Sequence, residues 1–116
     1  MVMQWRRTKY GNRKIELDGY LFDSAKEARR WKELRILERA GEITNLERQK
    51  RYTLTPTMKD RDGKVIERSS SYIADFYYKD KDGNVVVEDA KGYRTPEYIL
   101  KRKLMLCVHK IRISEV

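Results

Sequence analysis

The spacing of hydrophobic residues along the chain predicts a mixture of strands and helices. A two-residue period, in which successive side chains point to opposite faces, is typical of strands. It predicts strands over residues 43–55, 71–78, 85–91 and 110–116, with a turn at 59–64 between the first two. A smaller hairpin is predicted before them at residues 15–22, because Asp18-Gly19 is a favoured two-residue turn.

Two segments carry the signals of helix ends. Ser24 and Glu27 match a capping box, which predicts a first helix over residues 25–40. Thr95 is a good N-cap for a second helix over residues 96–107. The order helix, three strands, helix and strand predicts a single α/β domain, in which flanking helices cover a mixed β-sheet. The last strand is expected to pair parallel to an earlier one.

Four polar side chains fall where a hydrophobic core would exclude them. Glu27 lies in the middle of the apolar face of the first helix, and Asp75 lies in a strand that is apolar on both faces. Asp89 and Lys91 share one face at the end of the apolar strand that begins at Val85. Removing such charges from water is costly unless something compensates, so these residues are the candidates for function.

Some of these positions also have a structural explanation. Glu27 could serve only the capping box with Ser24, and a buried Asp75 is often satisfied by backbone N–H groups. Metal binding would account for the three carboxylates together, because hard cations such as Mg²⁺ take oxygen ligands. We expect Asp75 and Asp89 to bind Mg²⁺ or Mn²⁺, and Glu27 to hold a second ion or a bridging water. Lys91 would orient that water or stabilise a pentacovalent phosphate.

Composition narrows the class of partner. The chain has 116 residues, and 27 Lys and Arg against 18 Asp and Glu give a formal net charge of +9. This surplus of positive charge favours binding to a polyanion such as nucleic acid, although a soluble basic protein without such a partner can have it too. One Cys and one His exclude a Cys/His zinc site and an intrachain disulfide, which fits the cytoplasm. Cys107 is expected to be buried, and no apolar run approaches the ~20 residues of a membrane span.

A basic segment over residues 1–14 precedes the domain, which covers residues 15–116. Such a segment, with interleaved aromatic residues, suits a flexible arm that follows a phosphate backbone. A solvated terminus with Trp5 packed on the domain is the alternative. The candidate phosphate contacts are Arg6, Arg7, Arg94, Lys101 and Lys103.

The candidate residues resemble the motif of the PD-(D/E)XK nuclease superfamily. The resemblance consists of Glu27 on a helix, the strand Ile73-Ala74-Asp75-Phe76, and Val87-Glu88-Asp89-Ala90-Lys91-Gly92 before a second helix. The predicted element order is similar to that superfamily's restriction-endonuclease-like αβββαβ core. A shift of one residue would make Glu88 the ligand, but alternation with Lys91 favours Asp89. Gln49, on the strand after the first helix, is a further candidate contact or a surface residue.

The resemblance implies a metal-dependent endodeoxyribonuclease. In detail the chain is similar to small phage-encoded endonucleases, some of which resolve branched DNA such as Holliday junctions. It would then act in the cytoplasm of the bacterial host, and a junction substrate would require a homodimer with two active sites. A non-catalytic nucleic-acid-binding module on the same fold is one alternative. A structural protein whose charges are all surface pairs is another, and it requires the carboxylates to lie far apart.

Overall fold

The computed structural model of the chain describes residues 4–7, 13–91 and 93–116. The helices are α1 (Ala25–Arg39) and α2 (Pro96–His109). The strands are β1 (Gln4–Arg7), β2 (Arg13–Leu17), β3 (Tyr20–Phe22), β4 (Thr44–Thr55), β5 (Met58–Lys59), β6 (Val65–Glu67), β7 (Ser70–Lys79), β8 (Val85–Asp89) and β9 (Ser114–Glu115).

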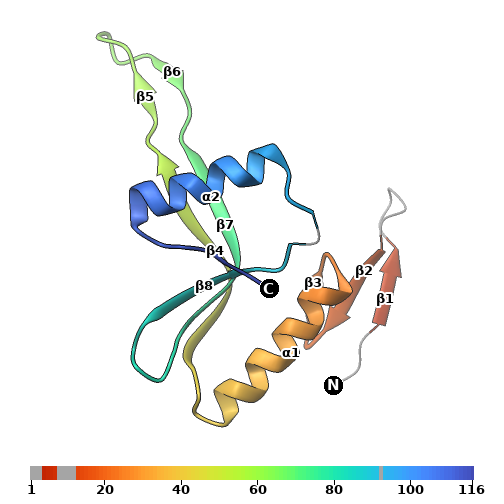
Figure 1. Ribbon diagram of the computed structural model, residues 1–116. Coiled ribbons are helices and arrows are strands. Elements are labelled where there is room, and N and C mark those ends of the chain that lie inside the picture. The colour runs from red at the N-terminus through yellow and green to blue at the C-terminus, as the bar shows by residue number, and fades with distance from the viewer. Residues whose placement is uncertain (1–3, 8–12, 92) are drawn as a thin grey trace.

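A mixed sheet with strand order β4-β7-β8-β9 forms the centre of the fold. β4 and β7 pair antiparallel, as do β7 and β8, whereas β9 is parallel to β8. α1 leads into β4, and α2 connects β8 to β9 (Figure 1). The chain is therefore a single α/β domain with a mixed sheet and two helices, which confirms the predicted fold class and the parallel last strand. Within the described ranges, neither helix is long and apolar enough to cross a membrane.

The predicted N-terminal hairpin is confirmed, and it is part of a larger sheet. β2 and β3 are joined through Asp18 (φ 55°) and Gly19 (φ 82°), the left-handed backbone that a tight hairpin turn needs. β1 adds a third strand by pairing antiparallel with β2. Residues 4–7 of the segment expected to be a flexible arm are thus held in a sheet, while residues 1–3 and 8–12 lie outside the described part of the chain.

The helices pack against opposite faces of β8. Val86 packs against a cluster in which Trp31 of α1 stacks on Phe76, with ring centroids 6.2 Å apart. Val87 belongs to a second cluster together with Met105 of α2. Because side chains alternate along a strand, the successive residues of β8 are shared between these two clusters. Glu88 and Asp89, which follow them, therefore face different helices.

A two-stranded ribbon extends the long pair β4 and β7. β5 and β6 pair antiparallel and project beyond the helices (Figure 1). The turn between them is closed by Asp60, whose Oδ1 accepts hydrogen bonds from the N–H groups of Asp62 (2.9 Å) and Lys64 (3.0 Å). The turn predicted at residues 59–64 is confirmed, with Lys59 already in β5.

Two predictions near the C-terminus were wrong. The last strand was expected over residues 110–116 but covers only Ser114–Glu115. Lys110 adopts a left-handed conformation (φ 60°) that ends α2, and the N–H of Ile111 donates back to the Met105 carbonyl at 3.3 Å. These bonds hold the start of the segment against the helix end instead of a strand. Cys107 is exposed, because α2 turns Met105, and not Cys107, toward the core.

Candidate active site

Glu27 lies in the first turn of α1. Its backbone N–H donates to Ser24 Oγ at 3.1 Å, so Ser24 is the N-cap of α1 as predicted. The Glu27 side chain points inward, since the residue is only 5% exposed. There Gln49 Nε2 donates to Glu27 Oε1 at 3.3 Å, and an Arg48 Nη lies 4.0 Å from the same oxygen.

Gln49 lies in β4 with an uncommon backbone conformation. Its φ of 52° falls in the left-handed region, which costs a non-glycine residue free energy. The flanking register pairs are Arg48 with Phe76 and Lys50 with Ala74, so Gln49 lies opposite Asp75. The strained residue therefore joins the helix carboxylate of Glu27 to the strand that carries Asp75, which makes it part of the candidate site.

Asp75 and Asp89 meet where β7 and β8 end their pairing. The last register pair is Phe76 with Glu88, and Asp75 and Asp89 are the next residues on the two strands. They are close enough for the negative charge of Asp89 to act on the Asp75 carboxyl. The N–H of Ala90 donates to Asp75 Oδ2 at 2.8 Å and fixes that carboxylate beside the end of β8.

Asp89 is held from two sides and is almost completely buried, with 1% exposure. The Tyr72 hydroxyl donates to its Oδ2 at 2.5 Å. Its Oδ1 is buried without a hydrogen bond, and the nearest cation is Lys91 Nζ at 3.4 Å. That ammonium also lies 4.8 Å from the centre of the Tyr98 ring. Lys91 and Tyr72 thus orient the carboxylate, while one of its buried oxygens has no hydrogen bond.

Glu88 is fully engaged on the other face of β8. Arg30 Nε donates to its Oε1 at 2.8 Å and Arg30 Nη2 to its Oε2 at 2.7 Å. The Tyr78 hydroxyl also donates to Oε2. A buried carboxylate with this bidentate partner is a structural ion pair, which favours Asp89 over Glu88 as the functional acid.

One cavity, which we call the carboxylate cavity, collects most of the predicted residues. Its volume is about 310 Å³. It is lined by Asp23, Ser24, Lys26, Glu27, Asp75, Ala90 and Lys91. Asp89 lies under this surface, in contact with Lys91. The cavity thus brings Glu27, Asp75 and Lys91 together, which argues against a protein whose carboxylates are scattered.

Two lining residues were not found from the sequence. Asp23 precedes the cap of α1 and binds Lys14 (2.5 Å), and Lys26 Nζ donates to the Lys91 carbonyl at 3.1 Å. Both lie within four residues of Glu27, and each resembles an ordinary surface charge of a first helical turn. Only the approach of β8 to the start of α1 shows that they face the cavity.

Burial makes the carboxylates of this cavity weaker acids. Burial, with smaller contributions from Asp75 and Asp23, raises the pKa of Glu27 to about 7. Burial also raises the pKa of Asp75 to about 6, and the negative charge of Asp89 adds to this rise. The Ala90 N–H and the Lys91 ammonium oppose it. A cation in the cavity would relieve the mutual repulsion of these groups.

The oxygen donors near the cavity are of the type that a hard divalent ion takes. Among the described residues, no three acidic, His or Cys side chains are grouped as a metal site by themselves. Mg²⁺ commonly takes only one or two protein carboxylates and fills its shell with waters and phosphate oxygens. Asp75 and Asp89, whose Oδ1 has no hydrogen bond, are two such carboxylates. By donor type these two residues fit a magnesium-like ion, which would take its remaining ligands from water and phosphate.

The predicted phosphate contacts have different settings. Arg94 pairs with Glu115 (2.6 Å) and Lys101 with Glu97 (3.1 Å). Lys103 lines a basic pocket beside α2. Arg6 and Arg7 lie in β1, and their side chains are outside the part that the structure describes.

Comparison with known proteins adds a family but no activity. A family model described as "Protein of unknown function (DUF1064)" matches residues 7–113. No curated protein and no solved structure matches the chain.

Proposed function

The chain belongs to the DUF1064 family, and we propose that it is a Mg²⁺- or Mn²⁺-dependent endonuclease that hydrolyses phosphodiester bonds of DNA. The main support is the meeting of Glu27, Asp75 and Lys91 at one cavity, with Asp89 in contact with Lys91. Carboxylates and an ammonium around a space open to a phosphate are the groups that metal-assisted phosphoryl chemistry uses. The resemblance of these residues to the PD-(D/E)XK motif supports the same activity.

Asp75 and Asp89 would hold the ion, and other residues keep them in place. The Ala90 N–H orients Asp75, and the Tyr72 hydroxyl orients Asp89. A bound divalent ion lowers the pKa of its water and offsets negative charge on a phosphate. Because the two carboxylates are fixed by the protein, little reorganisation is needed when an ion binds.

Glu27 and Lys91 have properties suited to proton transfer and charge stabilisation. A carboxylate with its pKa raised to about 7 can take a proton from an attacking water near neutral pH. Lys91 presents an ammonium at the cavity, where it can stabilise negative charge that develops on phosphate oxygens. Gln49 would orient Glu27 through its hydrogen bond.

Branched DNA is the proposed substrate, as the resemblance to junction-resolving phage enzymes implies. The net charge of +9 suits a polyanion, and the chain has no motif that reads bases, which favours recognition of backbone and shape. A junction substrate would place two copies of the chain on one DNA, so a homodimer belongs to this proposal. The place of action would be the cytoplasm of a bacterial host.

The test is a cleavage panel with junction, flap, duplex and single-stranded DNA in Mg²⁺, in Mn²⁺ and in EDTA. We expect metal-dependent cleavage, greatest for the junction, and its loss in Asp75→Asn and Asp89→Asn. Asp62→Asn is the matched control, because this carboxylate lies in the exposed turn of the β5–β6 ribbon. Cleavage that persists in EDTA or in Asp75→Asn would refute the proposal.

A binding module without catalysis is the second candidate. It is favoured by the finding that no three potential ligands form a ready metal site among the described residues. Tight DNA binding with no metal-dependent turnover of any substrate in the panel would select it.

A further inference from the structure

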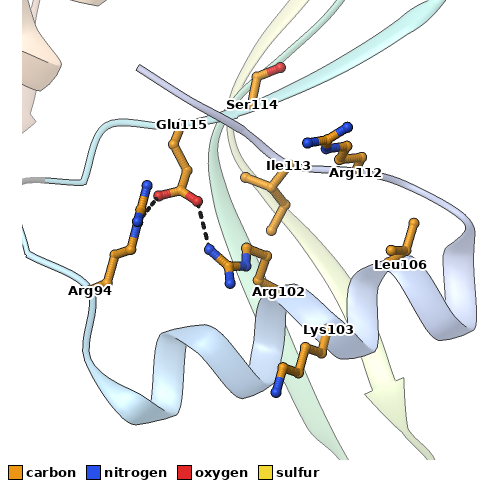
Figure 2. A pocket seen from close by; sticks show the side chains of 8 residues that line it. All are labelled: Arg94, Arg102, Lys103, Leu106, Arg112, Ile113, Ser114 and Glu115. Carbon is orange, nitrogen blue, oxygen red and sulfur yellow. Dashed lines mark hydrogen bonds and ion pairs between the residues drawn. The ribbon is translucent and has the colours of Figure 1, made fainter.

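The basic pocket that Lys103 lines lies between α2 and β9. We call it the arginine pocket, and its volume is about 730 Å³. Its charged lining consists of Arg94, Arg102, Lys103, Arg112 and Glu115. Four cations and one carboxylate thus line this pocket, and the cations come from the loop before α2, from α2 and from the segment before β9 (Figure 2). A pocket with this excess of positive charge attracts an anion.

The carboxylate of Glu115 lies between two of these cations, Arg94 and Arg102. Arg94 Nε donates to its Oε2 at 2.6 Å, and Arg102 Nη1 donates to its Oε1 at 3.0 Å. Figure 2 shows the two guanidinium groups approaching Glu115 from different sides. Two arginines that each bind one oxygen of an anion form an arrangement that phosphate also accepts. The Glu115 side chain is partly exposed, at 20%, so an anion from solvent can reach the two guanidinium groups.

The arginine pocket is continuous with the carboxylate cavity. A connecting pocket of about 470 Å³ shares Arg94 and Glu115 with the first and Lys26 and Lys91 with the second. The strand register also places the two sites next to each other, because Glu115 of β9 pairs with Asp89 of β8. Neighbouring strands lie about 4.8 Å apart, so the two sites are adjacent along the sheet.

We propose that the arginine pocket binds a backbone phosphate of the same DNA strand whose scissile phosphate enters the carboxylate cavity, and that Glu115 takes the place of this phosphate in the free protein. The inference rests on the proposed function in taking DNA as the ligand. Lys26 and Lys91 line the path between the two phosphates. Binding then exchanges one anion for another between Arg94 and Arg102, so Glu115 weakens DNA binding until it is displaced.

Opposite effects of two kinds of substitution test this exchange. Affinity for a short duplex oligodeoxynucleotide is measured in EDTA, where metal-dependent cleavage is absent. Glu115→Gln removes the competing charge and should tighten binding about three- to tenfold. Arg102→Gln should weaken binding about five- to tenfold and lower the salt dependence by about one phosphate contact. Arg94→Gln should do the same, and because its side chain is 61% exposed the substitution should cost little stability.

Matched variants distinguish an effect of the arginine pocket on DNA affinity from an effect of net charge. Glu42→Gln removes a carboxylate that pairs with Lys81, and Arg39→Gln removes an exposed cation at the end of α1; neither residue lines the arginine pocket. Both controls should leave affinity within about twofold. The proposal is overturned if Glu115→Gln binds no more tightly than Glu42→Gln, or if Arg94→Gln and Arg102→Gln behave like Arg39→Gln.

DNA in which one phosphate at a time is replaced by an uncharged group locates the contact. Together with cleavage assays it distinguishes this inference from the proposed nuclease activity. Methylphosphonate is placed at one DNA position at a time, and at one position the effects of Glu115→Gln and Arg102→Gln should vanish together. Opposite binding effects without any cleavage would retain this inference and reject the nuclease. Asp75-dependent cleavage with no effect of Glu115 or the arginines would do the reverse.

Discussion

The hydroxyl of Tyr72 donates a hydrogen bond to Asp89 across the interior of the protein, with 2.5 Å between the two oxygens. Both residues are buried, and the pair links β7 to the end of β8. Its presence explains how a carboxylate can lie at 1% exposure with only one ammonium beside it. The proton on Tyr72 is firmly held, because burial and the negative charge of Asp89 raise the pKa of the phenol.

Removing this hydroxyl should affect both folding and catalysis. In Tyr72→Phe the Asp89 carboxylate loses its donor, at a cost of about 1–3 kcal/mol in the free energy of unfolding. Cleavage in Mg²⁺ should fall by about tenfold or more, because the proposed metal ligand is no longer oriented. Tyr52→Phe, at a half-buried tyrosine of β4 outside the carboxylate cavity, is the control for aromatic substitution. Equal cleavage rates in the two variants would remove Tyr72 from the site.

Stability without metal should fall as pH rises from about 4.5 to 7. The pKa values of Glu27 and Asp75 are raised in the folded protein to about 7 and about 6, so the native state binds more protons than the unfolded state in this range. The corresponding stability is fully present below the unfolded pKa values and is lost as pH rises through the folded ones. Urea unfolding at a series of pH values measures this slope.

Replacing Glu27 by Gln should flatten that slope. The amide cannot ionise, so Glu27→Gln should be more stable than the natural chain at pH 8, by about 1–3 kcal/mol, and similar to it at pH 5. Glu33→Gln, an exposed position on α1, provides the comparison. If Glu27→Gln were instead less stable at pH 8, the raised pKa would not be a property of the folded protein.

Divalent ions should stabilise the protein in the same pH range in which it is weakest. Binding to the folded state alone raises the free energy of unfolding by about 2.7 kcal/mol at a hundredfold excess over Kd. The rise in Tm with Mg²⁺ or Mn²⁺ should be larger at pH 8 than at pH 5.5, because the ion competes with protons for Asp75 and Glu27. Asp75→Asn should remove the shift, whereas Glu88→Gln should retain it. Calorimetry in matched buffers without DNA provides the readout.

Breaking the ion pair between Arg30 and Glu88 should act on folding instead of chemistry. Arg30→Gln leaves a carboxylate of 1% exposure without its bidentate partner, which should cost about 3–5 kcal/mol. Arg29→Gln, at the adjacent exposed position of α1, should change stability by less than about 0.5 kcal/mol. Chemical denaturation distinguishes the two. A stable Arg30→Gln protein that has lost only metal binding would reassign Glu88 to the site.

The sequence predicted the candidate residues because each conflicts with its local pattern. Glu27 interrupts an apolar helix face, and Asp75 interrupts a strand that is apolar on both faces. Local patterns also predicted the helix and the strand that carry these two residues, since capping and turn signals act over a few residues. Asp89 was distinguished from Glu88 only by alternation, and the structure supplies the reason in the pairing of Glu88 with Arg30.

What the sequence did not predict depends on contacts between distant segments. Tyr72 is an ordinary strand residue until β8 places Asp89 against it, and Lys26 is an ordinary helix residue until its ammonium meets the Lys91 carbonyl. The shortness of β9 likewise follows from Lys110, a lysine in a left-handed conformation more often taken by glycine. Such positions carry no periodic signal, because their role exists only in the folded chain.

The ribbon of β5 and β6 has a consequence for how the molecule opens. Its side chains Met58, Val65 and Ile66 are exposed, so it buries little apolar surface, and an isolated two-stranded pair is only marginally stable in water. Its amide protons should therefore exchange with deuterium well before those of the middle of β7, which is paired on both sides. Melting of the protein is then expected to begin at this tip and to spread along β4 and β7 toward the carboxylates.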